Sequence, residues 1–294
     1  MQPTIGFIGI GIGVMGSSMV KNLLKANYSV VVYNRTKQKA DEVVSLGAKW
    51  ADTPAAVTTQ SDVVLSMVGY PQDVEAIYYG DDGIFSAVTP DKIVVDMTTS
   101  TPTLAQKIAA TASELGLQAL DAPVSGGDIG AQNGTLTVMV GGNQAAYEQV
   151  KPVFEAVGQT VQRFGEAGKG QHTKMANQIM IAGTMTGMTE MLVYAQAAGL
   201  DLPAVLKTVN GGSAQNWSLA NYGPRILAGD YTPGFFAKHF LKDLKIALEE
   251  SEKMGLNLPA TRQAKKLYAR LVNEAGLGDD GTQALIKLWT DSIK

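Results

Sequence analysis

Short apolar runs alternate with helix-like stretches through the first half of the chain. The runs are rich in β-branched residues and occupy Thr4–Gly9, Ser29–Tyr33, Val63–Met67, Lys92–Asp96, Leu117–Asp121 and Thr135–Val140. Between them, apolar residues at helical spacing predict helices over 17–26, 36–46, 73–79, 103–115 and 144–156, with Thr36 as a candidate N-cap. Continuous apolar strands that alternate with helices predict a parallel sheet covered by helices on both faces.

The second half of the chain has a different pattern, because no strand-like run follows Val161. Helical spacing predicts helices over 168–199, 202–209, 217–220, 240–254, 260–274 and 282–293. The predicted fold class is therefore α/β for the first domain, residues 1–165, and all-α for the second domain, residues 166–294. No segment rich in Ser, Pro or charge separates them, so the long helix is expected to form the joint.

The helix predicted from Gly168 to Gly199 carries polar groups at one end of an apolar stripe. Lys174, Asn177 and Gln178 stand at i, i+3 and i+4 and share a face. The same face continues as Ile181, Met185, Met188 and Leu192. A lysine in such a place is either a buried ion-pair partner or a group used for proton transfer, and helix spacing leaves both open.

Composition narrows the classes of function. A length of 294 residues suits two domains, and 45% hydrophobic with 17% charged residues suits a globular protein. The net charge of −3 gives no electrostatic case for nucleic acid or membrane lipid as a partner. With no cysteine and two histidines, disulfides and thiolate nucleophiles are excluded and no metal site is expected.

Two stretches bear on location. Met1-Gln2-Pro3 leads directly into a strand-like run without the basic start of a signal peptide, which predicts a cytoplasmic protein. Ile179–Leu200 has Glu190 as its only charge, but Thr, Gln and Gly residues interrupt it. This stretch is therefore expected to be a helix buried between domains or subunits and not a membrane span.

The first strand is followed by Gly11-Ile12-Gly13-Val14-Met15-Gly16, a full G-x-G-x-x-G that opens a helix. Glycines there allow a tight turn and bring backbone N–H groups close to a pyrophosphate at a helix N-terminus. A glycine-rich turn alone is also compatible with plain structure. The strand before it and the helix after it favour dinucleotide binding.

The end of the second strand bears on the choice of cofactor. It reads Tyr33-Asn34-Arg35-Thr36-Lys37, which offers no carboxylate for a ribose 2′-hydroxyl. Arg35 can meet a 2′-phosphate in a forked contact, so NADP is favoured over NAD. The alternative is that Arg35 is a solvated surface charge.

Two further loops follow later strands, where open α/β sheets bind their ligands. Residues 97–101 are rich in hydroxyls, and residues 121–127 read Asp-Ala-Pro-Val-Ser-Gly-Gly. Exposed backbone N–H groups beside a serine suit a carboxylate, although either loop is also compatible with ordinary turn chemistry.

Five segments together carry a family resemblance. They are GFIG…GVMG, DAPVSGG, GTLTVMVGG, GKGQHTKMANQ and FFAKHFLKDLKIAL, which occur in this order over nearly the whole chain. The chain resembles the 3-hydroxyisobutyrate dehydrogenase family of β-hydroxyacid dehydrogenases, which includes tartronate semialdehyde reductases and glyoxylate/succinic semialdehyde reductases. The resemblance implies a Rossmann domain, an all-helical domain and a substrate bound between them.

The resemblance also implies roles for individual residues. Lys174 would be the catalytic acid/base. Ser125, Gly126 and Gly127 would grip the substrate carboxylate, while Asn177 and Gln178 would orient it. The implied and motif-derived cofactor residues are Gly11, Ile12, Gly13, Val14, Met15, Asn34, Arg35, Thr36, Val68, Gly69, Thr99 and Lys242. Among these, Thr99 would lie near the nicotinamide and Lys242 would reach the cofactor from the helical domain.

The sequence departs from the family pattern at two places. Position 178 is Gln where many relatives have Asn. The first turn is two residues longer than the usual G-F-I-G-x-G-x-M-G, so Gly9, Gly11 and Gly13 compete for equivalent places. Two extra residues displace the turn by roughly 6–7 Å unless a bulge absorbs them.

These observations predict an NADP-dependent oxidoreductase that acts on a small β-hydroxyacid/aldehyde-acid pair. Because a lysine has a pKa of about 10.4 in water, it is an acid at neutral pH, which favours the reduction of a short semialdehyde or glyoxylate. The alternatives are an imine reductase, against which Lys174 counts, and a non-catalytic NADP-binding module. The expected partners are a small carboxylate-bearing substrate and further copies of the chain, as a homo-oligomer (dimer or tetramer).

Overall fold

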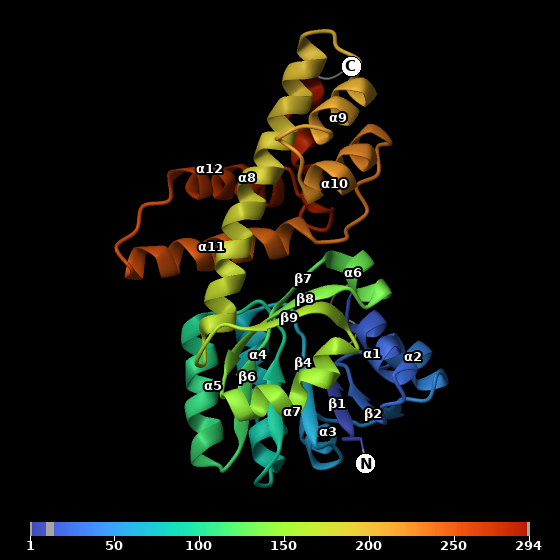
Figure 1. The fold of residues 1–294 in the computed structure, drawn as a ribbon, viewed down its shortest axis with the longest axis vertical. Coiled ribbons are helices and arrows are strands. Elements are labelled where there is room, and N and C mark those ends of the chain that lie inside the picture. The colour runs from blue at the N-terminus through green and yellow to red at the C-terminus, as the bar shows by residue number, and fades with distance from the viewer. Residues whose placement is uncertain (1, 10–14, 293–294) are drawn as a thin grey trace. The chain divides into compact units, whose positions relative to one another are not determined.

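The computed structural model describes residues 2–9 and 15–292, and Figure 1 traces their course. The chain divides into two compact units, Met1–Lys174 and Met175–Lys294. Within the described part of the chain, no helix is both long enough and apolar enough to cross a membrane.

A twisted sheet forms the centre of the first unit (Figure 1). Its strands are β1 (Ile5–Ile8), β2 (Val30–Tyr33), β3 (Lys49–Trp50), β4 (Val63–Ser66), β5 (Ile93–Asp96), β6 (Gln118–Asp121), β7 (Val124–Ser125), β8 (Leu136–Gly142) and β9 (Gly158–Arg163). They lie in the order β3-β2-β1-β4-β5-β6-β8-β7, with β9 paired to β8. The order reverses beside β1, as in a doubly wound Rossmann-type sheet.

The sheet is parallel over most of its width, as predicted, and mixed at one side. β1 to β6 pair in parallel, whereas β8 is antiparallel to both β6 and β7. The connection from β7 to β8 runs only through residues 126–135, which is shorter than the crossover that parallel strands need. β9 then returns parallel to β8.

Helices cover both faces of this sheet, as the apolar strands predict. Ile5 and Phe7 of β1 pack in one core with α1 (Gly16–Lys25), α2 (Asp41–Ser45) and α7 (Gln144–Glu155). Ile8 belongs to the opposite core, with α3 (Pro54–Thr59), α4 (Pro71–Tyr79) and α5 (Pro102–Glu114). Because successive strand residues point to opposite faces, both layers need apolar side chains.

The predicted helix over 36–46 is broken in the structure. A 3-10 turn, Lys37–Ala40, precedes the short α2. Thr36 does stand at the N-cap position, but its side chain makes no capping hydrogen bond there.

The second unit is helical. After α8 (Lys169–Ala197), which begins in the first unit, come α9 (Leu202–Asn210), α10 (Trp217–Leu227), α11 (Ala237–Lys253) and α12 (Pro259–Ala269), followed by a π turn (Arg270–Glu274) and a 3-10 segment (Thr282–Ser292). Met185, Met188 and Leu192 of α8 are buried against Leu206 and Tyr222, which confirms the apolar stripe.

Candidate functional site

The carboxyl ends of five strands lie level at one edge of the sheet. Tyr33, Ile8, Ser66, Asp96 and Asp121 are neighbours in register, and each is the last residue of its strand. The loops that follow contain Gly9, residues 34–36, 68–69 and 98–100, and the start of the 121–127 loop. The fold therefore brings most of the predicted cofactor residues of the first unit to the edge where doubly wound sheets bind ligands.

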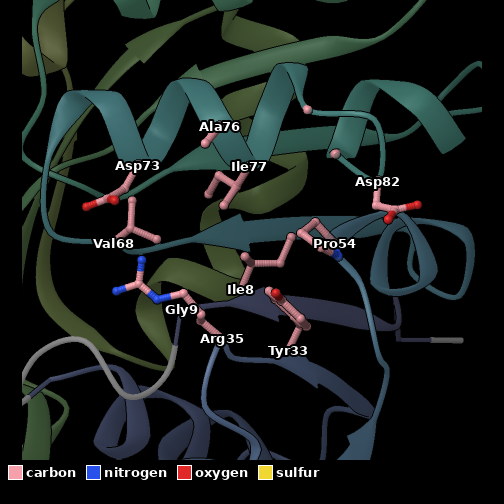
Figure 2. A pocket seen from close by; sticks show the side chains of 12 residues that line it. Ile8, Gly9, Tyr33, Arg35, Pro54, Val68, Asp73, Ala76, Ile77 and Asp82 are labelled. Carbon is pink, nitrogen blue, oxygen red and sulfur yellow. The ribbon is translucent and has the colours of Figure 1, made fainter.

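A hollow of about 270 Å³ opens at this edge, beside β1, β2 and β4 (Figure 2). Arg35 and Val68, both predicted cofactor residues, line it together with Tyr33, Pro54 and Ile77. Arg35 is exposed, and Figure 2 shows its guanidinium on the side of the hollow that Val68 and Asp73 form. The hollow thus combines apolar walls with the Arg35 cation and with the carboxylates of Asp73 and Asp82.

Gly9 lets the chain pass close to the neighbouring strand at the floor of this hollow. Its φ is +98°, and a Cβ there would lie 2.2 Å from the backbone oxygen of Met67. Only glycine fits without a shift of the backbone. The predicted Gly11, Ile12, Gly13 and Val14 lie outside the described residues. Met15 precedes α1, and its side chain packs against the core.

Asn34 and Thr36 shape the turn after β2. Asn34 is buried, and its Nδ2 donates to the backbone oxygen of Thr36 over 2.8 Å. This bond closes the turn from which Arg35 projects.

Lys174 lies near the start of α8 and is almost fully buried, with 6% of its surface exposed. Its Nζ donates to the backbone oxygen of Val124 over 2.8 Å. Val124 directly precedes the predicted carboxylate-binding residues, so the Lys174 Nζ lies beside that loop.

The 124–127 segment turns sharply. β7 ends at Ser125, and Gly126 and Gly127 follow with φ of 132° and 63°. Both angles lie in the left-handed region that favours glycine. The chain then enters the short helix α6 (Gly127–Asn133), and Ser125, Gly126 and Gly127 all stay half-buried.

A buried polar network supports the loops after β4 and β5. Asp96 accepts from Ser66 Oγ at 3.1 Å and from the backbone N–H of Thr98 at 3.1 Å. Thr98 Oγ1 in turn accepts from the backbone N–H of Val68 at 3.0 Å. Burial raises the pKa of Asp96 to about 7, although the hydrogen bonds from Thr98 and Ser66 oppose this. Sequence patterns did not single out Asp96, because an acid at a strand end has no periodic signal.

In the second unit, three predicted residues join one hydrogen-bonded set. Asn177 Nδ2 donates to Gln178 Oε1 over 2.7 Å, and Gln178 Nε2 donates to Asp243 Oδ2 over 2.6 Å. Lys242 Nζ forms an ion pair with Asp243 Oδ1 at 3.1 Å. Asp243 thus connects the predicted substrate residues to the predicted cofactor lysine, and its burial was not foreseen. The described residues contain no group of three His, Asp or Glu side chains arranged for a metal ion.

Family models cover almost the whole chain. Residues 4–165 match the NAD binding domain of 6-phosphogluconate dehydrogenase, and residues 168–289 match the NAD-binding domain of NADP-dependent 3-hydroxyisobutyrate dehydrogenase. A probable mitochondrial 3-hydroxyisobutyrate dehydrogenase-like protein 1 of Arabidopsis thaliana is 47% identical over 94% of this chain and 83% of its own. This chain belongs to the 3-hydroxyisobutyrate dehydrogenase family.

Two further relatives show the range of the family. The 2-hydroxy-3-oxopropionate reductase of Escherichia coli is 39% identical over 90% of this chain and 89% of its own. The NAD-dependent L-serine dehydrogenase of Pseudomonas aeruginosa is 37% identical over 95% of this chain and 96% of its own. The family therefore holds both named reductases and named dehydrogenases of small hydroxyacids.

Solved structures agree with the fold. The 3-hydroxyisobutyrate dehydrogenase of Salmonella typhimurium has a TM-score of 0.88 at 28% identity and covers 97% of this chain and 99% of its own. Psf3, solved with NADP+ and 2-OPP, has a TM-score of 0.91 at 26% identity and the same coverage. The protein is an oxidoreductase with a nicotinamide cofactor, acting on CH–OH groups in the manner of hydroxyacid dehydrogenases.

Proposed function

We propose that the protein uses NADPH to reduce a short aldehyde acid, with Lys174 as the general acid. The observation that carries this proposal is the hydrogen bond from the buried Lys174 Nζ to the Val124 backbone oxygen, directly before Ser125-Gly126-Gly127. A proton donor and a loop suited to a carboxylate thus lie side by side in the first unit. A substrate that carries both a carboxylate and a carbonyl fits that pairing.

The preference for NADPH rests on the turn after β2. A nicotinamide dinucleotide fits the sheet edge, because the hollow there has apolar walls and Arg35 at its rim. The turn lacks a carboxylate, and Asn34 is engaged with Thr36. The exposed guanidinium of Arg35 is the group that suits a 2′-phosphate. Since a relative is named NAD-dependent, family membership alone does not fix this preference.

The roles of the side chains follow from their chemistry. A bound NADPH supplies a hydride to the carbonyl carbon. Lys174 Nζ donates a proton to the oxygen on which negative charge develops, which is general acid catalysis. The Ser125 hydroxyl and the backbone N–H groups of Gly126 and Gly127 bind the carboxylate and so orient the carbonyl. Asn177 and Gln178 are proposed to orient the substrate as well.

The test is a screen for NADPH oxidation over glyoxylate, succinic semialdehyde, tartronate semialdehyde and methylmalonate semialdehyde, with one cyclic imine for comparison. We expect turnover of at least one aldehyde acid. Lys174→Ala should still bind NADPH and lose nearly all turnover, whereas Lys169→Ala, an exposed lysine on the same helix, should stay active. Near-normal turnover by Lys174→Ala, or turnover of the imine alone, would refute the proposal.

A further inference from the structure

The start of α8 is held by a buried carboxylate at the end of β6. Asp121 is 3% exposed, its Oδ1 accepts from the backbone N–H of Gly168 at 2.7 Å, and its Oδ2 accepts from that of Gln171 at 2.8 Å. N–H groups in the first turn of a helix have no partner within the helix, and a negative charge there is favourable. Burial raises the pKa of Asp121, and the bonds from these amides oppose that shift.

Two glycines allow this close approach between helix and strand. A Cβ at Gly170 would lie 2.4 Å from the Met139 backbone oxygen and 2.8 Å from Asp121 Oδ2. A Cβ at Gly141 would lie 2.5 Å from Asp121 Oδ1. The first turn of α8 therefore rests directly on β6 and β8, and little freedom is left in its position.

Gln171 adds a second attachment, to the loop after β5. It is fully buried, its Nε2 donates to the Thr98 backbone oxygen at 2.7 Å, and its Oε1 accepts from the Ser100 N–H at 3.0 Å. These two bonds flank Thr99, the residue predicted to lie near the nicotinamide. Gln171 also stands one turn before Lys174, so the two side chains share a helix face.

These hydrogen bonds connect the helical turn that carries the proposed proton donor to two loops of the sheet edge. Asp121 and Val124 belong to one segment, and that segment holds the helix through the first-turn amides and through the bond from Lys174 to the Val124 oxygen. The same helical turn is tied to the Thr99 loop by Gln171. Displacement of the first turn would move Lys174 relative to both the 124–127 loop and Thr99.

We infer that Asp121 and Gln171 are positioning residues, which fix Lys174 between the loop that binds the substrate carboxylate and the Thr99 loop. This inference rests on the proposed role of Lys174 as general acid. Asp121→Asn tests it with almost no change in side-chain volume. The amide keeps only one acceptor oxygen, so one of the two hydrogen bonds from the helix is lost. Gln171→Met tests the second attachment by removing both of its hydrogen bonds.

The expected result is a loss in kcat, by about 100-fold for Asp121→Asn if the proton donor moves by about 1 Å. NADPH affinity should stay at the wild-type value in Asp121→Asn, because the Asp121 carboxylate bonds the start of α8 and none of the proposed cofactor residues. In a Lys174→Ala background, Asp121→Asn should cause almost no further loss, since residues that act as a unit are not additive.

The matched control is Asn143→Ala. Asn143 caps α7 in the same unit, and its Oδ1 accepts from the N–H groups of Ala145 at 2.8 Å and Ala146 at 3.1 Å. Its removal should lower the melting temperature and leave kcat unchanged when measured well below that temperature.

Three outcomes would decide the matter. Wild-type kcat in both Asp121→Asn and Gln171→Met, with Lys174→Ala inactive, would overturn this inference and leave the proposed function standing. A kcat that returns to the wild-type value when Asp121→Asn and Gln171→Met are assayed well below their melting temperatures, as expected of Asn143→Ala, would likewise overturn it. Full activity of Lys174→Ala would instead refute the proposed function and the inference with it.

Discussion

Asn34 and Arg35 leave the end of β2 in opposite directions. Asn34 is buried and bonded to Thr36, whereas Arg35 is exposed and lines the hollow at the sheet edge. The sequence predicts both as cofactor residues because they adjoin in the chain. Their different exposures assign them different tasks: one shapes the turn and the other is accessible to a ligand.

Replacing Arg35 should therefore affect the binding of NADPH and of NADH differently. We expect Arg35→Ala to weaken NADPH binding by roughly 10- to 100-fold, the value of a charge-assisted hydrogen bond of about 1.5–3 kcal/mol. NADH binding should change little. Titration of each cofactor against wild type measures this. Lys37→Ala is the control, because Lys37 is exposed nearby and lies 5.2 Å from the ring centre of Trp50. Equal losses for both cofactors would contradict the assignment.

Asp96 should give the protein a pH-dependent stability. Its folded-state pKa of about 7 lies above the ordinary value of 3.8, because burial disfavours the charged form. Between these two values the folded state binds more protons than the unfolded state, so stability falls as pH rises through this range. We expect Asp96→Asn, which keeps an acceptor for Ser66 and Thr98, to flatten the decline. Urea unfolding at pH 5 and pH 8 tests this, and an unchanged slope would contradict it.

At the scale of elements, the predictable segments are those that are apolar on both faces. β1, β2, β4, β5 and β6 were found from continuous apolar runs because the sheet is covered on both sides. β9 was missed because it is an edge strand whose sequence, GQTVQR, is mostly polar. α6 was missed because its glycines have low helical propensity. The change from a 3-10 turn to α2 at residues 40–41 was missed because the apolar spacing continues across it.

The contact between α8 and the sheet predicts the effect of a single methyl group. Gly170→Ala would place Cβ against the backbone oxygens of Met139 and Asp121, at 2.4 and 2.5 Å, and neither backbone atom can rotate away. We expect a loss of about 1–3 kcal/mol in the free energy of unfolding. Kinetic assays should show reduced kcat, because Lys174 lies one turn further along the helix.

Thermal unfolding of Gly170→Ala and Lys169→Ala would test this effect. Lys169→Ala alters the adjacent, exposed position and should unfold as wild type does. A Gly170→Ala protein as stable as Lys169→Ala would mean that the first turn of α8 can move away from the sheet without cost.

At the scale of the whole molecule, the site was predictable only as far as local motifs reach. The 121–127 loop and Lys174 are separated by some fifty positions, yet each carries its own motif, and the hydrogen bond from Lys174 to Val124 brings them together. Asp96 had no such motif, and the motif that begins at Asp121 gave no sign of that carboxylate's contacts, because the partners of these two acids come from a neighbouring strand and from the first turn of α8. Such contacts become visible only once strand order and register are known.

The exposed face of α8 bears on the expected homo-oligomer. Met180 is 65% exposed and Tyr194 is 75% exposed, and Gly183 and Gly187 share their helix face. Among the described residues, a Cβ built at either glycine would meet no atom within 4 Å apart from the adjoining backbone of α8 itself. Large apolar side chains beside glycines suit close packing against another copy of the chain. The homo-oligomer predicted from the sequence is expected to bury this face.

Two substitutions on this face distinguish an interface from a free surface. In a monomer, Gly183→Ala should stabilise the helix by up to about 1 kcal/mol, because alanine has the higher helix propensity. In an oligomer packed on this face, the added methyl group should instead destabilise the assembly, and Met180→Asp should lower the mass found by sedimentation. We expect the second pattern, with a melting temperature that rises with protein concentration. The opposite result is an assembly mass that Met180→Asp does not alter, together with a stabilising effect of Gly183→Ala. That result would mean that the protein is a monomer or that its interface lies on another face.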